Sequence, residues 1–518
     1  MPEYYWGEEW KRRWWRRHGK PVTVDLAKDP HGGLIGPPGC GKGVTNEIVN
    51  LLAGKGALGE GLCDCNVISL DTTGQNYGVT HRWRSEFSDI VRLNWFNLLG
   101  FGDDGFNPML FSEEHDEQAA LGQCLQYVSG QEREPLWSEG AQDFYIGSVS
   151  LEIYEAKKEN RTPTLENVYG NICGDYTATA KRMFETGIYE LATAGGGFLE
   201  KNRTNDGIIK TAVTSGRWLR NEAIRKSLSV PKSKGFDPMR LITGDRPVTV
   251  YAMLDADKVA GPYAGVLKLV AVSVLNVMFR FGTQRKRDTV IMLSEAAAIG
   301  NLPKIKDALA QGRKYGIRIC PMVWQDSGQI TTVFGKEGKT TVLGNSGSLL
   351  GFCPAPLDLD TADLLASQLG EILGVNESTS EDIQGGNLKR NVREERQRLW
   401  TSDEVGSLPR FHGLVWKSNK AAPVPVACPP YWKIPELKGR YDPDPYPHSS
   451  PAPATSRRKV IAMAAALAAV IGGGLRLSNA AGSGPTWRDD KPVVRVDPPK
   501  ANPPAHGSPR KPPHVTRR

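Results

Sequence analysis

The stretch GGLIGPPGCGKGVTNEIVNLLAGKG, residues 32–56, decides the fold of this 518-residue chain. Residues 36–42 read G-P-P-G-C-G-K, follow a strand-like apolar run and open a segment with apolar residues at helical spacing. In such a loop, backbone N–H groups at a helix start point at phosphate oxygens, and glycines allow close approach. The pattern predicts a nucleotide-binding loop made of Gly36, Pro37, Pro38, Gly39, Cys40, Gly41, Lys42, Gly43 and Val44. The alternative is a glycine- and proline-rich turn that contains a lysine by chance.

The lysine of this loop and the residue after it would contact different parts of a bound nucleotide, the phosphates and the Mg²⁺ ion. Lys42 would place its ammonium group on the β- and γ-phosphates of ATP as a point charge. Gly43 stands where a Ser or Thr hydroxyl usually touches Mg²⁺. Thr45 has a hydroxyl, but it lies two residues further round the helix and is expected to point elsewhere. The loop therefore predicts ATP binding with a weakened Mg²⁺ site.

Strand-like and helix-like segments alternate along much of the chain. The apolar runs at residues 66–71, 247–254, 288–295, 317–324 and 347–353 read as strands, and residues 264–282 and 302–316 read as helices. This alternation predicts an α/β fold, a P-loop NTPase with a doubly wound, mostly parallel sheet. Residues 108–235 carry apolar residues three and four apart and few strand-like runs, which predicts a mostly helical insertion.

The segment DTVIMLSEAAAIG, residues 288–300, holds the acidic strand end that an ATPase of this class needs. Such enzymes place a carboxylate there to hold Mg²⁺, often followed by a glutamate that orients water. Glu295 occupies the position of the water-orienting acid, whereas Ser294 replaces the metal-holding Asp and could hold a metal only through a bound water. Asp288 cannot substitute, because six strand residues span about 20 Å. The alternative for Glu295 is an exposed acid at a strand end.

Two further polar residues end predicted strands. Asp71 ends NVISLD, and Gln325 ends IRICPMVWQ. In a doubly wound sheet, ligands bind outside the carboxyl ends of the strands. We therefore expect Asp71, Glu295 and Gln325 to converge with the loop on one nucleotide. A turn or capping role is the alternative for Asp71 and for Gln325.

Composition changes at both ends of the chain. Residues 1–31 are polar and include the basic, aromatic run KRRWWRRHGK, which predicts an arm that binds polyanions or lipid headgroups. The last 43 residues hold nine Lys or Arg against three acidic residues and are rich in proline, which is typical of a disordered tail. The predicted segments are an arm (1–31), the first part of the NTPase domain (32–107), the insertion (108–235), the second part of the NTPase domain (236–440), a Pro/Ser linker (441–458), an apolar segment (459–477) and the tail (478–518).

Residues 460–475, VIAMAAALAAVIGGGL, are the one membrane candidate in the sequence. About 16 helical residues reach roughly 24 Å, less than a hydrocarbon core of about 30 Å. A membrane anchor and an Ala-rich soluble helix both remain open. The net charge of +8 over the whole chain allows a nucleic-acid partner without requiring one.

The eight cysteines point to a reducing compartment and no metal site. None lies in a C-x-x-C pair, and Cys63 and Cys65 lack further Cys or His at zinc-like spacing.

A family resemblance accompanies these motifs. The strings GPPGCGKGV, VISLDTTGQ, FNPM, residues 293–335, DTADLLASQLG and LWTSDEVGSLP occur in the order seen in coupling proteins of the TraG/TraD type. The chain resembles this family over roughly residues 32–435, most specifically over residues 293–335. Members often carry Gly after the loop lysine, so Gly43 fits the family pattern. Ser294 departs from it, as does the lack of transmembrane helices before the loop.

The resemblance implies a RecA-like motor domain with an all-helical insertion. It implies a homo-hexamer at the cytoplasmic face of the bacterial inner membrane that recruits DNA, with a relaxase or a secreted protein, and delivers it to a type IV secretion channel with ATP and Mg²⁺. By motif position, Lys42 would bind phosphate, Glu295 would activate water and Gln325 would sense the γ-phosphate. Ser294 makes slow hydrolysis the expectation. A nucleotide-binding recruitment platform without hydrolysis and another ring-shaped DNA-pumping ATPase are the alternatives.

Overall fold

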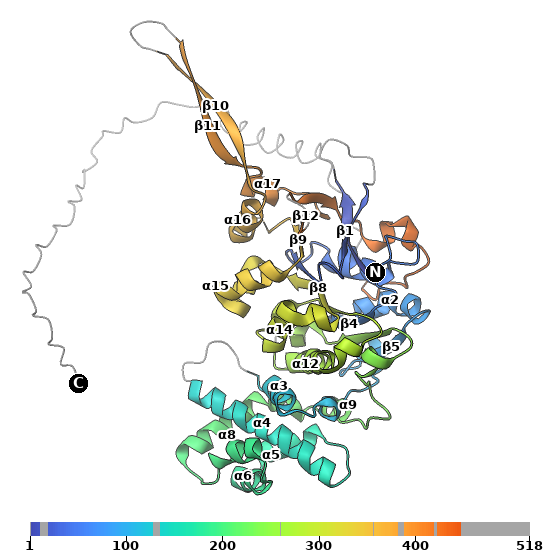
Figure 1. The fold of residues 1–518 in the computed structure, drawn as a ribbon, viewed down its shortest axis with the longest axis vertical. Coiled ribbons are helices and arrows are strands. Elements are labelled where there is room, and N and C mark those ends of the chain that lie inside the picture. Colours follow the sequence, from blue (N-terminus) through green and yellow to red (C-terminus); the bar gives the residue numbers. More distant parts are fainter. Residues whose placement is uncertain are drawn as a thin grey trace, which may run out of the picture. The chain divides into compact units, whose positions relative to one another are not determined.

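The described chain is built on a sheet of eleven strands (Figure 1). The structure is a computed structural model that describes residues 2–10, 19–127, 135–259, 261–355, 357–381, 388–418 and 422–446. The strand order is β2-β1-β13-β12-β9-β3-β8-β7-β4-β6-β5. Most of the basic run at residues 11–20, the apolar segment 460–475 and the tail 478–518 lie outside the described residues.

Seven neighbouring strands of this sheet are parallel. In sheet order they are β9 Ser348–Phe352, β3 His31–Ile35, β8 Ile317–Trp324, β7 Thr289–Leu293, β4 Asn66–Asp71, β6 Val248–Met253 and β5 Asp89–Leu93. Nearly every residue of these strands except those of β5 is buried, as expected for parallel strands covered on both faces. The predicted α/β fold with a mostly parallel sheet is thereby confirmed.

The remaining four strands extend the sheet in antiparallel fashion beyond β9. They are β12 His412–Lys417, β13 Val424–Ala427, β1 Glu3–Glu9 and β2 Pro21–Asp25. The interpretation of residues 1–31 as a polar arm is therefore wrong. The charges of residues 11–20 favour a solvated arm, whereas Tyr4, Tyr5 and Trp6 are buried and make β1 a core strand.

The pleat of the parallel strands sends alternate residues into two hydrophobic cores. Leu34, Val67 and Val290 belong to the core on one face, and their neighbours Ile35, Ile68 and Ile291 to the core on the other. The second core also contains buried residues of α12 Ala264–Phe281, α14 Pro303–Gln311 and α15 Ser327–Asn345. On the first face lie η1 Gly43–Glu47, α1 Ile48–Leu52 and α2 Gln75–Ser85.

The insertion is helical throughout the part that the structure describes (Figure 1). Its elements are η3 Pro108–Phe111, α3 His115–Leu125, α4 Pro135–Lys158, α5 Leu165–Cys173, α6 Tyr176–Glu185, α7 Tyr189–Gly196, α8 Arg203–Ser215, η4 Arg217–Arg220 and α9 Glu222–Ser227. Helix α3 packs on α12, where Arg280 Nη1 donates to the Glu117 carboxylate at 3.2 Å. The insertion is thus joined to the sheet domain through α12.

Short elements complete the described chain. They are η2 Leu98–Gly100, α10 Arg240–Thr243, α11 Ala256–Val259, η5 Gly282–Gln284, α13 Ala296–Ile299, η6 Gly312–Tyr315, α16 Leu359–Ser367, the hairpin β10 Glu371–Glu381 with β11 Leu388–Arg398, α17 Ser402–Gly406, η7 Tyr431–Lys433 and η8 Pro435–Leu437. The predicted linker begins later than residue 441, because Asp444 accepts hydrogen bonds from Gln75 Nε2 and from the Tyr431 hydroxyl.

One described segment, Ala264–Gln284, is long and apolar enough to cross a membrane. Because 78% of its most apolar stretch is buried inside the protein, it is explained as the core helix α12 and its extension.

Replacing Trp6 tests the assignment of β1 to the sheet. The Trp6 ring approaches Gly32 of β3 so closely that a Cβ there would lie 2.7 Å from it. We expect Trp6→Ala to lower the free energy of unfolding by about 3–5 kcal/mol in urea titrations, since it empties a fully buried site. The control Tyr189→Ala removes an aromatic ring that is 81% exposed and should change it by less than about 0.5 kcal/mol. Equal, small effects of both would place β1 outside the core.

His31 should make the stability depend on pH. Burial, and secondarily the charge of Arg318, lower the pKa of His31 from its ordinary value of 6.5 to about 4. The unfolded chain therefore binds a proton that the folded chain excludes, so stability is present above the unfolded pKa and is lost as pH falls. As the pH falls from about 7 to about 5, this histidine should lower the free energy of unfolding by about 2 kcal/mol. His31→Asn can still accept the hydrogen bond from the Ile319 N–H and should flatten that slope. An unchanged slope in His31→Asn would contradict the assignment.

Candidate nucleotide-binding site

The loop between β3 and η1 has the backbone geometry of a phosphate-binding loop. Gly39 and Gly41 have φ of +76° and +100°, values that side chains other than glycine rarely adopt. Pro38 and Gly39 are exposed, and a Cβ at Gly39 would meet no atom within 4 Å. Helix η1 starts at Gly43 with a turn of π-helix and continues into α1. The loop is thus open above a helix start, where the first backbone N–H groups generally lack intrahelical acceptors, and this arrangement fits a phosphate chain.

Lys42 lies inside this loop. Its Nζ donates hydrogen bonds to the carbonyl oxygens of Gly36 at 2.6 Å and of Pro37 at 3.1 Å. Thr45 Oγ1 donates to the carbonyl of Gly41 at 2.9 Å. This hydroxyl therefore binds the loop backbone, in line with the expectation that it does not point at the Mg²⁺ position. The ammonium is therefore held by neutral acceptors that anionic phosphate oxygens can replace.

The other loop residues support this shape. A Cβ at Gly36 would lie 2.9 Å from Cys40 Sγ, and burial raises the pKa of the Cys40 thiol. Val44 is buried in the core beneath the helix. The ring of Phe411 lies against Gly41 from the neighbouring segment.

Glu295 and Gln325 come together at the ends of two neighbouring parallel strands. Gln325 Nε2 lies 3.4 Å from Glu295 Oε2 and 3.5 Å from Oε1, and Gln325 also holds Gln329 through its backbone N–H. Burial raises the pKa of the Glu295 carboxyl, and the charge of Lys42 opposes that shift. Glu295 thus interacts with the charge of Lys42 and with the amide of Gln325 beside the loop.

Ser294 lies next to this pair, and its hydrogen-bond partner is Glu47, a residue for which the sequence predicted no role. Its Oγ donates a short hydrogen bond to Glu47 Oε2, which also accepts from Asn76 Nδ2 at 3.1 Å. Burial raises the pKa of the Glu47 carboxyl, and the nearby charges of Asp71 and Glu295 raise it further. The available signal was the one acidic residue in the helical run 44–52.

Asp71 faces the protein backbone. Its two oxygens accept from the backbone N–H groups of Thr73, Gly74, Asn76 and Tyr77 and from the Thr73 hydroxyl, at 2.8–3.3 Å. Asp71 thereby organises the turn that starts α2. This geometry favours the turn and capping role over direct contact with a nucleotide.

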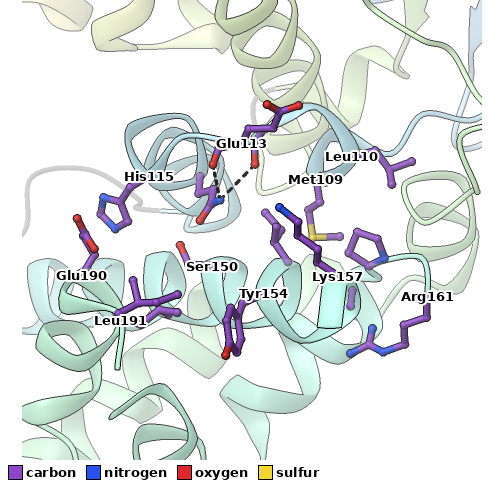
Figure 2. Close-up of a pocket in the computed structure, with 16 residues that line it drawn as sticks. Met109, Leu110, Glu113, His115, Ser150, Tyr154, Lys157, Arg161, Glu190 and Leu191 are labelled. Carbon is purple, nitrogen blue, oxygen red and sulfur yellow. Dashed lines mark hydrogen bonds between the residues drawn. The ribbon is translucent and has the colours of Figure 1, made fainter. Parts of the chain in front are cut away.

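One cavity lies beside these residues, and another lies within the insertion. One, of about 760 Å³, is lined by Glu295, Gln325, Gln329 and Lys268, and burial lowers the pKa of Lys268. Figure 2 shows the other, of about 570 Å³, where side chains from η3, α3, α4 and α7 converge, among them Met109, His115, Tyr154 and Leu191. The second cavity contains no residue of the phosphate-binding loop.

Within the described residues, no group of three or more His, Cys, Asp or Glu side chains is arranged to hold a metal by itself. Mg²⁺ in nucleotide sites usually uses one or two carboxylates together with substrate phosphates and waters. The donor set beside the loop, with the Glu47 carboxylate and the Ser294 hydroxyl, fits such a shared site.

The family profile described as "Type IV secretory system Conjugative DNA transfer" matches residues 3–444. The chain belongs to this family. The resemblance to conjugative coupling proteins is thereby confirmed, and it extends to strand β1.

Two curated relatives match half of the chain. The conjugal transfer protein TraG of Agrobacterium fabrum (strain C58 / ATCC 33970) is 28% identical over 292 residues, which are 52% of this chain and 40% of that protein. TraG of Rhizobium radiobacter gives the same identity, with 42% of that protein covered. The matched part therefore spans less than half the length of these relatives.

Solved structures of a coupling protein share the fold. The unbound monoclinic form of TrwBdeltaN70 has a TM-score of 0.57 at 16% identity, over 82% of this chain and 93% of that one. The plasmid coupling protein TrwB in complex with ADP and Mg²⁺ has a TM-score of 0.55 at 17% identity, over 82% and 95%. These identities show the fold alone.

Alanine at two loop glycines gives a matched test of the site. A Cβ at Gly41 would lie 2.5 Å from the Phe411 ring at a positive φ, whereas at Gly43 its nearest contact is Gln75 Oε1 at 3.6 Å. We expect Gly41→Ala to weaken binding of a fluorescent ATP analogue by about tenfold, from backbone strain of roughly 1–2 kcal/mol. Gly43→Ala should change it by less than about threefold. Equal effects would show that the loop does not hold the phosphates in this conformation.

Proposed function

We propose that this chain is an ATP-dependent coupling protein that delivers DNA, with a relaxase or another secreted protein, to a type IV secretion channel. Family membership over residues 3–444 supports the DNA-transfer part. The convergence of the phosphate-binding loop with the Glu295–Gln325 pair carries the ATP-dependent part. The structure of TrwB in complex with ADP and Mg²⁺ agrees with ATP and Mg²⁺ as the ligands proposed for this chain.

Each residue of the site has a role in this proposal. Lys42 binds the β- and γ-phosphates, and the backbone of residues 36–44 surrounds them. Glu295 orients the attacking water, and Gln325 senses the γ-phosphate through its contact with Glu295. When bound, Mg²⁺ would neutralise charge on the phosphate oxygens, and Ser294 would hold one of its waters. Asp71 acts indirectly, by fixing the turn beside the site.

The proposed working form is a homo-hexamer at the cytoplasmic face of the bacterial inner membrane. Residues 460–475 are the candidate anchor, with Arg457, Arg458 and Lys459 on the side of the ATPase domain, as the positive-inside tendency favours. The basic run at residues 11–20 is a candidate contact for DNA or anionic lipid.

ATP turnover with and without single- and double-stranded DNA tests the proposal. DNA-stimulated hydrolysis is expected, and its absence would favour a recruitment platform without hydrolysis. DNA transfer that continues without a cognate secretion channel would favour another ring-shaped DNA pump.

Two substitutions separate nucleotide binding from turnover. Lys42→Ala should abolish binding of the fluorescent ATP analogue and DNA transfer, because it removes the phosphate-binding charge. Glu295→Gln should bind the analogue like the wild type but lower turnover by at least about 100-fold, the usual contribution of a positioned base. Full turnover in Glu295→Gln would remove Glu295 from its proposed role.

A further inference from the structure

Glu47 is a buried acid for which the fold alone provides incomplete compensation. The residue is 4% exposed, and within the described chain no Lys or Arg forms an ion pair with it. Both of its hydrogen bonds, from Asn76 Nδ2 and from Ser294 Oγ, fall on Oε2. Oε1 has no hydrogen-bond partner among the described residues. A buried carboxylate in this state is costly unless a cation is near it.

The position of Glu47 on the helix directs its carboxylate towards the nucleotide site. Glu47 follows Gly43 by four residues, about one helical turn, so both lie on the same side of η1. Helical side chains lean towards the N-terminus, here towards the phosphate-binding loop. Gly43 has no side chain, so nothing from that position stands between the Glu47 carboxylate and the helix start.

The contact with Ser294 places this carboxylate at the end of β7. A metal-holding Asp would stand at position 294 in the family pattern, and Ser294 instead points its hydroxyl at Glu47. The chain thus lacks a carboxylate on the strand and has one on the facing helix, at hydrogen-bond distance from the vacated position. The charge available to a cation at this point is the same in both arrangements.

We propose that Glu47 is the carboxylate ligand of the nucleotide-bound Mg²⁺, taking the place of the Asp that Ser294 replaces. Ser294 and Asn76 are positioning residues that hold Oε2 and leave Oε1 for the cation or one of its waters. This inference rests on the proposed ATP site. It replaces the expectation of a weakened metal site with one in which the ligand comes from the helix.

Nucleotide affinity with Mg²⁺ and with EDTA tests the assignment without relying on turnover. The probe is a fluorescent ATP analogue on the full chain, and the readout is the ratio of its affinities in Mg²⁺ and EDTA. Glu47→Gln keeps the size and hydrogen bonding of the side chain but removes its charge. We expect it to lower that ratio by at least about tenfold and to leave the affinity in EDTA within about threefold.

Moving the carboxylate back to the strand is the decisive comparison. The double variant Glu47→Gln with Ser294→Asp should recover most of the Mg²⁺ dependence that Glu47→Gln loses. Ser294→Ala should keep at least about a third of it, because the charged ligand remains. The matched control Glu86→Gln removes an exposed acid at the end of α2 and should change nothing.

The outcomes separate this inference from the proposed function. A chain that binds no nucleotide in EDTA or Mg²⁺ contradicts the proposed function itself. Wild-type binding with an unchanged ratio in Glu47→Gln overturns only the role of Glu47. If Glu47→Gln does not fold, Ser294→Ala decides, because loss of the whole Mg²⁺ effect there would assign the metal to Ser294 instead.

Discussion

The parallel pairing of β3, β8 and β7 is the constraint on which the site depends. Ile35 of β3 is level with Trp324 of β8, and Leu293 of β7 is level with Met322. The phosphate-binding loop, Gln325 and the pair Ser294–Glu295 therefore leave the sheet at one edge within a few residues of each other. Slipping one strand by a residue would turn its buried side chains to the other face, so two apolar cores hold this register.

Polar groups at this edge are compensated in different ways. Asp71 receives five hydrogen bonds, mostly from backbone N–H groups, and so shapes a turn. Glu295 has a glutamine beside it and the charge of Lys42 nearby. Glu47 has only two neutral donors on one oxygen. A bound cation would therefore stabilise Glu47 more than the other two carboxylates.

Local patterns in the sequence were sufficient to place the glycine-rich loop between a strand and a helix, the parallel strands and the helical insertion, because each rests on periodicity or on spacing within a few residues. The place of β1 in the sheet was not predicted, because its pairing with β13 joins segments more than 400 residues apart. The charges at residues 11–20 favoured a solvated arm instead. Glu47 was missed for a related reason. Its significance comes from Ser294, 247 residues away, and one acidic residue on a helix gives no sign in the sequence of a partner so distant.

A crystal structure with a non-hydrolysable ATP analogue and Mn²⁺ tests the central claim most directly, because anomalous scattering locates the metal. The account predicts phosphates held by residues 36–43 beside Lys42, and a metal peak that contacts the Glu47 carboxylate directly or through one water. A metal peak at Asp71, or phosphates bound away from the loop, would contradict it.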